Sequence, residues 1–110
     1  MRKPKFEILV GKDGKIRFHL KAANGEVILA SRSYITKPEA VHGIASVMRY
    51  GVLESSYVRR ESINSQFFFQ IKSPAGRLLG WSEMYRSRQG RETGIAAVQK
   101  AALVGRVLEI

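Results

Sequence analysis

The chain has 110 residues, 45% of them hydrophobic, so we expect a single domain over residues 1–110 with one core. It has no cysteine, which excludes disulfides, thiolate metal sites and a cysteine nucleophile. It also has no apolar run of signal-peptide or membrane-span length, so we predict a cytoplasmic protein without a membrane partner. A net charge of +10 at pH 7 favours polyanions such as nucleic acid as partners, the alternative being a basic surface that only keeps the protein soluble.

Three strands are predicted at the start of the chain. Apolar and β-branched residues indicate a strand over Phe6–Val10, and the turn residues Gly11–Gly14 predict a hairpin to a second strand over Lys15–Lys21. Asn24-Gly25, two residues that tolerate positive φ, predict a second hairpin that leads to a strand over Glu26–Ala30.

A helix is predicted next. Thr36 can cap it, Pro38 suits its first turn, and Glu39 completes a capping box, so we expect a helix from this point to about Tyr50. The residues expected on its buried face are Val41, Ile44, Ala45 and Met48. A further strand is predicted over Val52–Val58.

The second half of the chain repeats the first. A shift of about fifty residues aligns Phe18–Lys21 with Phe69–Lys72 and keeps four further pairs in register: Gly25 with Gly76, Ser31 with Ser82, Tyr34 with Tyr85, and Gly43 with Gly94. We therefore expect an α+β protein made of two strand-strand-strand-helix units, repeat one over about 1–56 and repeat two over about 57–110.

The second unit should contain a helix over about Gln89–Leu103 and then a strand over Val104–Ile110, with Ile95 and Val98 of the helix buried. Gly43 and Gly94, which are unfavourable inside helices, indicate close contact between each helix and the sheet.

These residues resemble a known family. Phe18–Glu26, with Ser31, Tyr34 and Gly43-Ile44 after it, is similar to the YegP-like family of small bacterial proteins, and Ser82–Tyr85 with Gly94–Val98 is similar to the second repeat of that family. The resemblance implies tandem β(3)-α-β repeats in a single antiparallel sheet, with two helices packed on one face and the C-terminal strands exchanged between repeats. It implies no activity, because the family is uncharacterised. Since a duplicated chain contains both halves of the sheet, we expect a monomer that is an internal pseudo-dimer.

Residues for catalysis are not evident. His19 and His42 lie on a predicted strand and a predicted helix without the spacing of a metal pair, and the single aspartate, Asp13, belongs to a turn. No serine stands in a nucleophile elbow, and no glycine-rich phosphate loop is present. We therefore expect a protein that is not an enzyme and has no catalytic residue, metal or cofactor.

The first candidate binding surface is the face of the sheet that the helices leave open. Alternation along the second strand of each unit turns Phe68 outward, where its ring could stack on a base among cations; the alternative is a Phe68 covered by the chain terminus or a partner subunit. The other residues expected on this face are Lys15, Arg17, His19, Lys21, Gln70 and Lys72.

The second candidate is the start of the second helix. Arg86, Arg88 and Arg91 surround Ser87 at a helix end that usually carries acids, so free backbone N–H groups and guanidinium groups could bind a phosphate there. Lys37 is the equivalent of Arg88 in the first helix. A solvated run of charges is the alternative.

Two functions remain open after the sequence analysis. The favoured one is a non-catalytic module that contacts nucleic acid, RNA or single strands in particular, through the sheet face and the helix start. The alternative is a protein-interaction or accessory module with no nucleic-acid role. A small-molecule function would require a ligand-sized pocket between helix and sheet.

Overall fold

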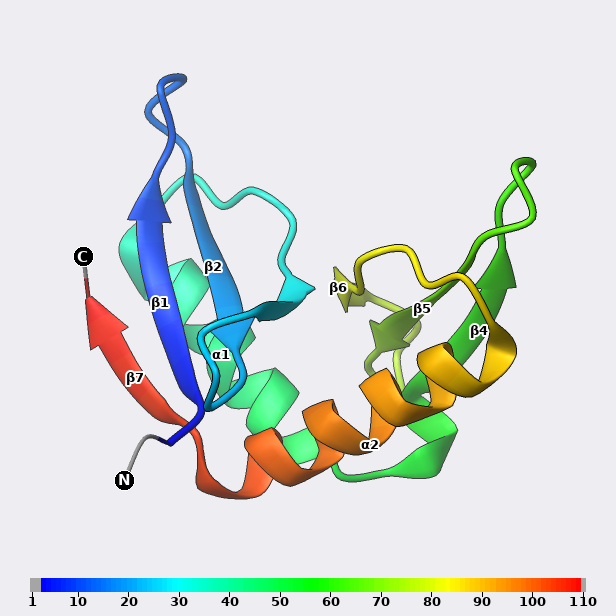
Figure 1. The fold of residues 1–110 in the computed structure, drawn as a ribbon. Helices are drawn as coiled ribbons and strands as arrows, with labels where there is room; N and C mark the ends of the chain where they lie inside the picture. The colour runs from blue at the N-terminus through cyan, green and yellow to red at the C-terminus, as the bar shows by residue number, and fades with distance from the viewer. Residues whose placement is uncertain (1–2, 110) are drawn as a thin grey trace.

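The computed structural model describes residues 3–109, and within this range two helices cover one sheet (Figure 1). The sheet has seven strands in the order β4-β5-β6-β3-β2-β1-β7. The elements in chain order are β1 (Lys5–Val10), β2 (Ile16–Lys21), β3 (Val27–Ala30), α1 (Lys37–Tyr50), a 3-10 turn (Glu54–Ser56), β4 (Tyr57–Glu61), β5 (Phe67–Lys72), β6 (Leu78–Trp81), α2 (Arg88–Val104) and β7 (Arg106–Glu109).

Six of the strands pair antiparallel, and β7 lies parallel to β1 at one edge of the sheet. The prediction of a wholly antiparallel sheet is therefore wrong at this edge. The chain leaves α2 at the end of the sheet where β1 begins, so a short strand that follows directly can only run in the direction of β1.

The two halves of the sheet meet at its centre, where β3 and β6 are joined through the single pair Ala30 and Trp81. Figure 1 shows the ends of β3 and β6 meeting between the two hairpins, with the tips of the β1–β2 and β4–β5 hairpins projecting from the same end of the molecule. Each half has the order strand-strand-strand-helix, as the sequence predicts.

One apolar core lies between the sheet and both helices. Strand register turns Phe18 and Leu20 of β2 to the same side as Phe69 and Ile71 of β5, and all four side chains are fully buried. The helices contribute Ile44, Val47, Ile95 and Val98 to the same core. Both helices therefore pack on one face of the sheet, and the other face is left uncovered by them.

Two helix glycines make room for tyrosine rings. Tyr34 follows β3 and lies under Gly43 of α1, and Tyr85 follows β6 and lies under Gly94 of α2. Each ring stacks on a phenylalanine of the sheet, Tyr34 on Phe18 at 6.1 Å and Tyr85 on Phe69 at 6.4 Å between centroids. The close contact predicted at both glycines exists, but a tyrosine ring makes most of it.

The start of α1 matches its prediction, whereas its buried face was only partly predicted. Thr36 is the N-cap, and its side chain and that of Glu39 form the capping box. The buried residues are Ala40, Gly43, Ile44 and Val47, while Val41 is 42% exposed and Ala45 is exposed. At Gly43 the Tyr34 ring occupies the space that a larger side chain would fill.

The segment after α1 differs from its prediction. Val52–Val58 does not form a strand of its own, because the 3-10 turn Glu54–Ser56 intervenes and β4 begins at Tyr57. The Tyr57 hydroxyl donates a 2.6 Å hydrogen bond to the carbonyl of Gly51 at the end of α1, which fixes this tight connection. After α2, the predicted strand is present as β7, and Ile110 lies outside the described residues.

Candidate nucleic-acid interface

The uncovered face of the sheet carries most of the residues predicted for it. Arg17, His19 and Lys21 of β2 alternate with the partly buried Ile16 and the buried Phe18 and Leu20. The pairing carries the same face across the sheet to Phe68, Gln70 and Lys72 of β5. Lys15, exposed, lies at the end of the β1–β2 turn that leads into β2. Phe68 is partly exposed, so its ring is not sealed under another part of the described chain.

Trp81 stands at the centre of this face. It is paired with Ala30 on one side and with Gln70 on the other, so it belongs to the row that also contains His19, and 39% of its surface is exposed. Phe68 and Lys72, each two residues from Gln70 along β5, are its diagonal neighbours at about 7–8 Å. Ala30 carries only a methyl group, which leaves the indole uncrowded on the β3 side.

Sequence reasoning did not assign Trp81 to the site. Alternation along β6 would turn Trp81 to the same side as the buried Leu79, two residues earlier, and Gly80 between them is buried as well. The direction of Trp81 therefore becomes clear only from the single pair that joins β3 to β6.

Two cations of the face are partly neutralised by a buried acid, Glu7. This carboxylate is 4% exposed and accepts ion pairs from Lys21 Nζ at 2.7 Å and Lys5 Nζ at 3.4 Å. Hydrogen bonding from Lys21 lowers the pKa of Glu7 below its ordinary value, although burial acts against this. Arg17 is paired in the same way with Asp13 of the turn, at 3.1 Å.

Other cations of the face have no acidic partner among the described residues. Arg60 of β4 is paired with Phe68 and donates through Nε to Oε1 of Gln70 at 3.1 Å, while Lys72 makes no ion pair within residues 3–109. His19 is half-buried, and burial together with the Lys21 ammonium lowers its pKa, so it is neutral at pH 7. The positive charge available to a ligand therefore lies on the lysines and arginines.

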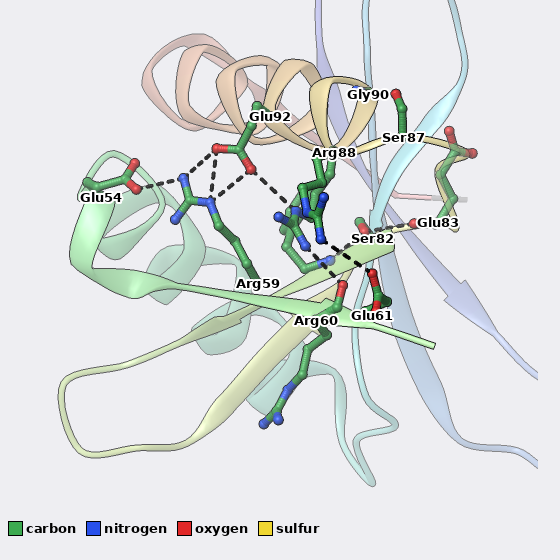
Figure 2. Close-up of polar contacts among 12 residues, drawn as sticks. Glu54, Arg59, Arg60, Glu61, Ser82, Glu83, Ser87, Arg88, Gly90 and Glu92 are labelled. Carbon is green, nitrogen blue, oxygen red and sulfur yellow. Dashed lines mark hydrogen bonds and ion pairs between the residues drawn. The ribbon is translucent and has the colours of Figure 1, made fainter. Parts of the chain in front are cut away.

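The start of α2 has a different character (Figure 2). Ser87 is the N-cap and accepts a hydrogen bond from the N–H of Gly90 at 2.9 Å.

The arginines at this helix start are mostly engaged within the protein. Arg91 is largely buried: its guanidinium binds Glu92 at 3.3 Å and donates to the carbonyl of Arg60 at 3.1 Å. Arg88 and Arg91 both lie over the ring of Phe67, and Arg88 is 3.9 Å from Glu61. Arg86 is exposed.

This arginine cluster and the open sheet face lie on opposite sides of β5, because Phe67 and Phe68 point in opposite directions. Figure 2 shows the same division one strand further out, where Arg59 points toward α2 and Arg60 points away from it. The two sites predicted from the sequence are therefore not brought together on one surface.

Arg59, which sequence reasoning missed, holds this edge of the sheet to α2. Its guanidinium contacts Glu92 of the helix and Glu54 of the 3-10 turn, each at 2.7 Å. Hydrogen bonds from Arg59 lower the pKa of Glu92, and the two carboxylates raise the pKa of Arg59. The adjacent basic pair Arg59-Arg60 was the only signal in the sequence.

Residues 3–109 contain neither a metal-like cluster of side chains nor a membrane-spanning helix. No group of three or more histidine, aspartate or glutamate side chains is gathered as a metal would require. Neither helix in this range has the length and apolarity needed to cross a membrane.

The chain belongs to the family described as Domain of unknown function (DUF1508), which it matches over residues 12–55 and 63–109. Its curated relatives carry the family name UPF0339. It is 43% identical to the UPF0339 protein YegP of Escherichia coli over 94 residues, 86% of each chain, and 37% identical to a UPF0339 protein of Acinetobacter baylyi over 105 residues, 96% of this chain and 95% of that one. The YegP-like family predicted from the sequence is thus confirmed.

Two solved structures share the fold. The solution NMR structure of yegP from E. coli, a protein of unknown function, has a TM-score of 0.92 at 38% identity and covers 99% of this chain and 94% of its own. The solution NMR structure of a UPF0339 protein from Shewanella oneidensis has a TM-score of 0.88 at 31% identity, covering 97% and 92%.

Proposed function

We propose that the open face of the sheet binds single-stranded nucleic acid, RNA or DNA, without catalysing a reaction. The observation that carries this proposal is the exposure of Trp81 at the centre of an uncovered sheet, with Phe68 as a diagonal neighbour. Aromatic rings on an open sheet stack on unpaired bases of any sequence, at about 1–3 kcal/mol per base.

Cations surround these two rings. The basic residues of the face are Lys5, Lys15, Arg17, Lys21, Arg60 and Lys72, against which stand the acids Glu7 and Asp13. When these side chains contact the phosphates of a bound strand, the counterions of the phosphates are released, so affinity should fall steeply as salt rises. The exposed Arg86 and Arg88 at the start of α2 are further phosphate contacts for a strand that passes around the β4 edge.

The intrinsic fluorescence of Trp81 tests the proposal, because the protein has no other tryptophan. A stacked base should quench the emission saturably when a single-stranded oligouridine is added, and Phe68→Ala should weaken binding roughly tenfold. Lys72→Glu should weaken it as well, whereas Lys100→Glu, an exposed charge reversal on α2, should have a much smaller effect. Unchanged emission at saturating oligonucleotide would refute stacking on Trp81. If one dominant protein still co-purifies after nuclease treatment and no oligonucleotide binds, the protein-interaction alternative replaces the proposal.

We further propose that the chain is a tandem repeat, with units of about 1–56 and 57–110, that acts as a cytoplasmic monomer. The same strand order, tyrosine stacking and serine hydrogen bonds in both halves support a duplication. The pairing of β7 with β1 supports exchange of the last strand of the second unit into the first half of the sheet, and the presence of both halves in one chain supports a monomer.

A further inference from the structure

A groove of about 360 Å³ lies on the helix side of the molecule, away from the open sheet face. Its walls are α1, the segment between β3 and α1, and the turn of the β5–β6 hairpin, and its volume falls in the lower part of the range of small-molecule sites. The helix contributes Glu39, His42, Ser46 and Tyr50, which are spaced three or four residues apart and so share one face.

Two arginines line the groove from different segments of the chain. Arg32 comes from the segment before α1 and lies 4.6 Å over the ring of Tyr34, and Arg77 comes from the β5–β6 turn. Neither forms an ion pair with an acid of residues 3–109. The one carboxylate in the groove, Glu39, accepts hydrogen bonds from the N–H and the hydroxyl of Thr36 in the capping box. The groove therefore holds two unpaired cations.

The other half of the molecule shows that the fold does not require these arginines. In the register that pairs Tyr34 with Tyr85, Glu83 stands at the place of Arg32 and Glu26 at the place of Arg77. Burial raises the pKa of Tyr85, and the carboxylates of Glu83 and Glu26 raise it further, whereas Arg32 acts to lower the pKa of Tyr34. The same backbone positions thus carry opposite charge.

The polar helix face is also much reduced in the second half, where only a threonine remains of it. In the same register, the equivalents of His42, Ser46 and Tyr50 in α2 are Thr93, Ala97 and Ala101. Both helices contribute buried residues to the same core, so packing explains neither the hydrogen-bonding side chains of α1 nor the two arginines that line the groove beside it. A ligand with an acid group explains both.

We propose that this groove binds a small organic anion, with its phosphate or carboxylate group between Arg32 and Arg77 and its body along His42, Ser46 and Tyr50. Guanidinium forks bind both acid groups by paired hydrogen bonds. The site is separate from the proposed nucleic-acid face, since its residues lie on the helix side of the sheet.

The test is an NMR titration of the 15N-labelled protein with four probes: adenosine monophosphate, benzoate, inorganic phosphate and uncharged adenosine. Saturable shifts are expected at the amides of Gly43, Ser46 and Ala75 with at least one of the two organic anions, and none with adenosine. Stronger binding of the monophosphate assigns a phosphate ligand, and stronger binding of benzoate a carboxylate ligand.

Charge reversal supplies the control. Arg77→Glu places at this site the residue that the other half carries, in an exposed turn, and should weaken binding roughly tenfold or more while leaving the dispersed NMR spectrum of the folded protein in place. Lys100→Glu changes the net charge equally and should leave the groove shifts unaltered, as should Trp81→Ala, which removes the stacking platform of the sheet face. Absence of saturable shifts with either organic anion up to about 10 mM, or equal affinity of Arg77→Glu and the parent, would overturn the proposal.

Discussion

Replacing Gly43 of α1 by alanine should destabilise the protein, although alanine is the better helix former. An alanine Cβ at this position would overlap the Tyr34 hydroxyl and lie 2.8 Å from Cζ of that ring and 3.1 Å from Cε2 of Phe18. Tyr34 is 5% exposed and stacked on Phe18, so the ring has little room to move. Overpacking of this kind costs about 3 kcal/mol at the upper end of its range, and the gain in helix propensity is about 1 kcal/mol. The net loss should be about 2 kcal/mol.

Thermal and urea unfolding followed by circular dichroism measure this loss, which corresponds to a fall in Tm of about 8 °C for a domain of this size. Gly90→Ala is the matched control, because the nearest atom to its Cβ would be the Ser87 hydroxyl at 3.2 Å and the Tyr85 carbons would stay at 3.5 Å or more; it should be neutral or slightly stabilising. Adding Tyr34→Phe to Gly43→Ala removes the closest atom and should recover about half of the loss. A Gly43→Ala variant as stable as the parent would refute the packing argument.

Three further predictions concern single side chains. Glu7→Gln should lower the free energy of unfolding at pH 7 by about 1–2 kcal/mol, because two lysines lose their buried acid. The pKa of Glu7 is lower in the folded protein than its ordinary value of 4.5, so the stability that ionised Glu7 contributes is present above that value and is lost as the pH falls through the folded pKa. The difference in unfolding free energy between variant and parent should therefore close on acidification, which urea unfolding at several pH values measures. Ser82→Ala should cost about 1–3 kcal/mol in urea unfolding, because the buried N–H of Phe69 loses its acceptor at 3.0 Å. Thr36→Ala removes the capping box of α1 and should lower the unfolding free energy by about 1 kcal/mol in the same assay.

Each of these predictions has its own contrary outcome. A constant difference between Glu7→Gln and the parent down to pH 3 would show that the charge of Glu7 is not the source of its effect. A neutral Ser82→Ala would mean that water replaces the hydroxyl as acceptor for Phe69. Thr36→Ala without effect would mean that tertiary contacts alone fix the first turn of α1.

Local signals gave the most reliable predictions of the fold. The capping residues Thr36 and Glu39 and the turn at Asn24-Gly25 act within a few residues of chain, so their consequences do not depend on the rest of the fold. Gly25 adopts the positive φ that the hairpin prediction requires, 89°, whereas Asn24 does not. By contrast, the buried face of α1 depends on Tyr34, a side chain from outside the helix, and hydrophobicity alone selected Val41 in place of Ala40.

Long-range pairing explains what the sequence did not reveal about the site. The outward position of Trp81 depends on one pair between β3 and β6, and the separation of Arg91 from the sheet face depends on how α2 crosses β5. Glu7, an acid within an apolar strand, is buried because Lys5 and Lys21 converge on it from two strands. The alternation of β2 and β5, however, correctly identified Arg17, Lys21, Phe68 and Lys72 as members of one face.

Fluorescence anisotropy with labelled single- and double-stranded DNA and RNA, at low and near-physiological salt, tests the central claim most directly. We predict micromolar or tighter binding of a single strand at near-physiological salt, preferred over duplexes and weakened roughly tenfold or more by Trp81→Ala. The claim would be contradicted if all four nucleic acids bound equally, at low salt only, and Trp81→Ala left their affinity unchanged. The net charge of +10 would then belong to a solvated basic surface.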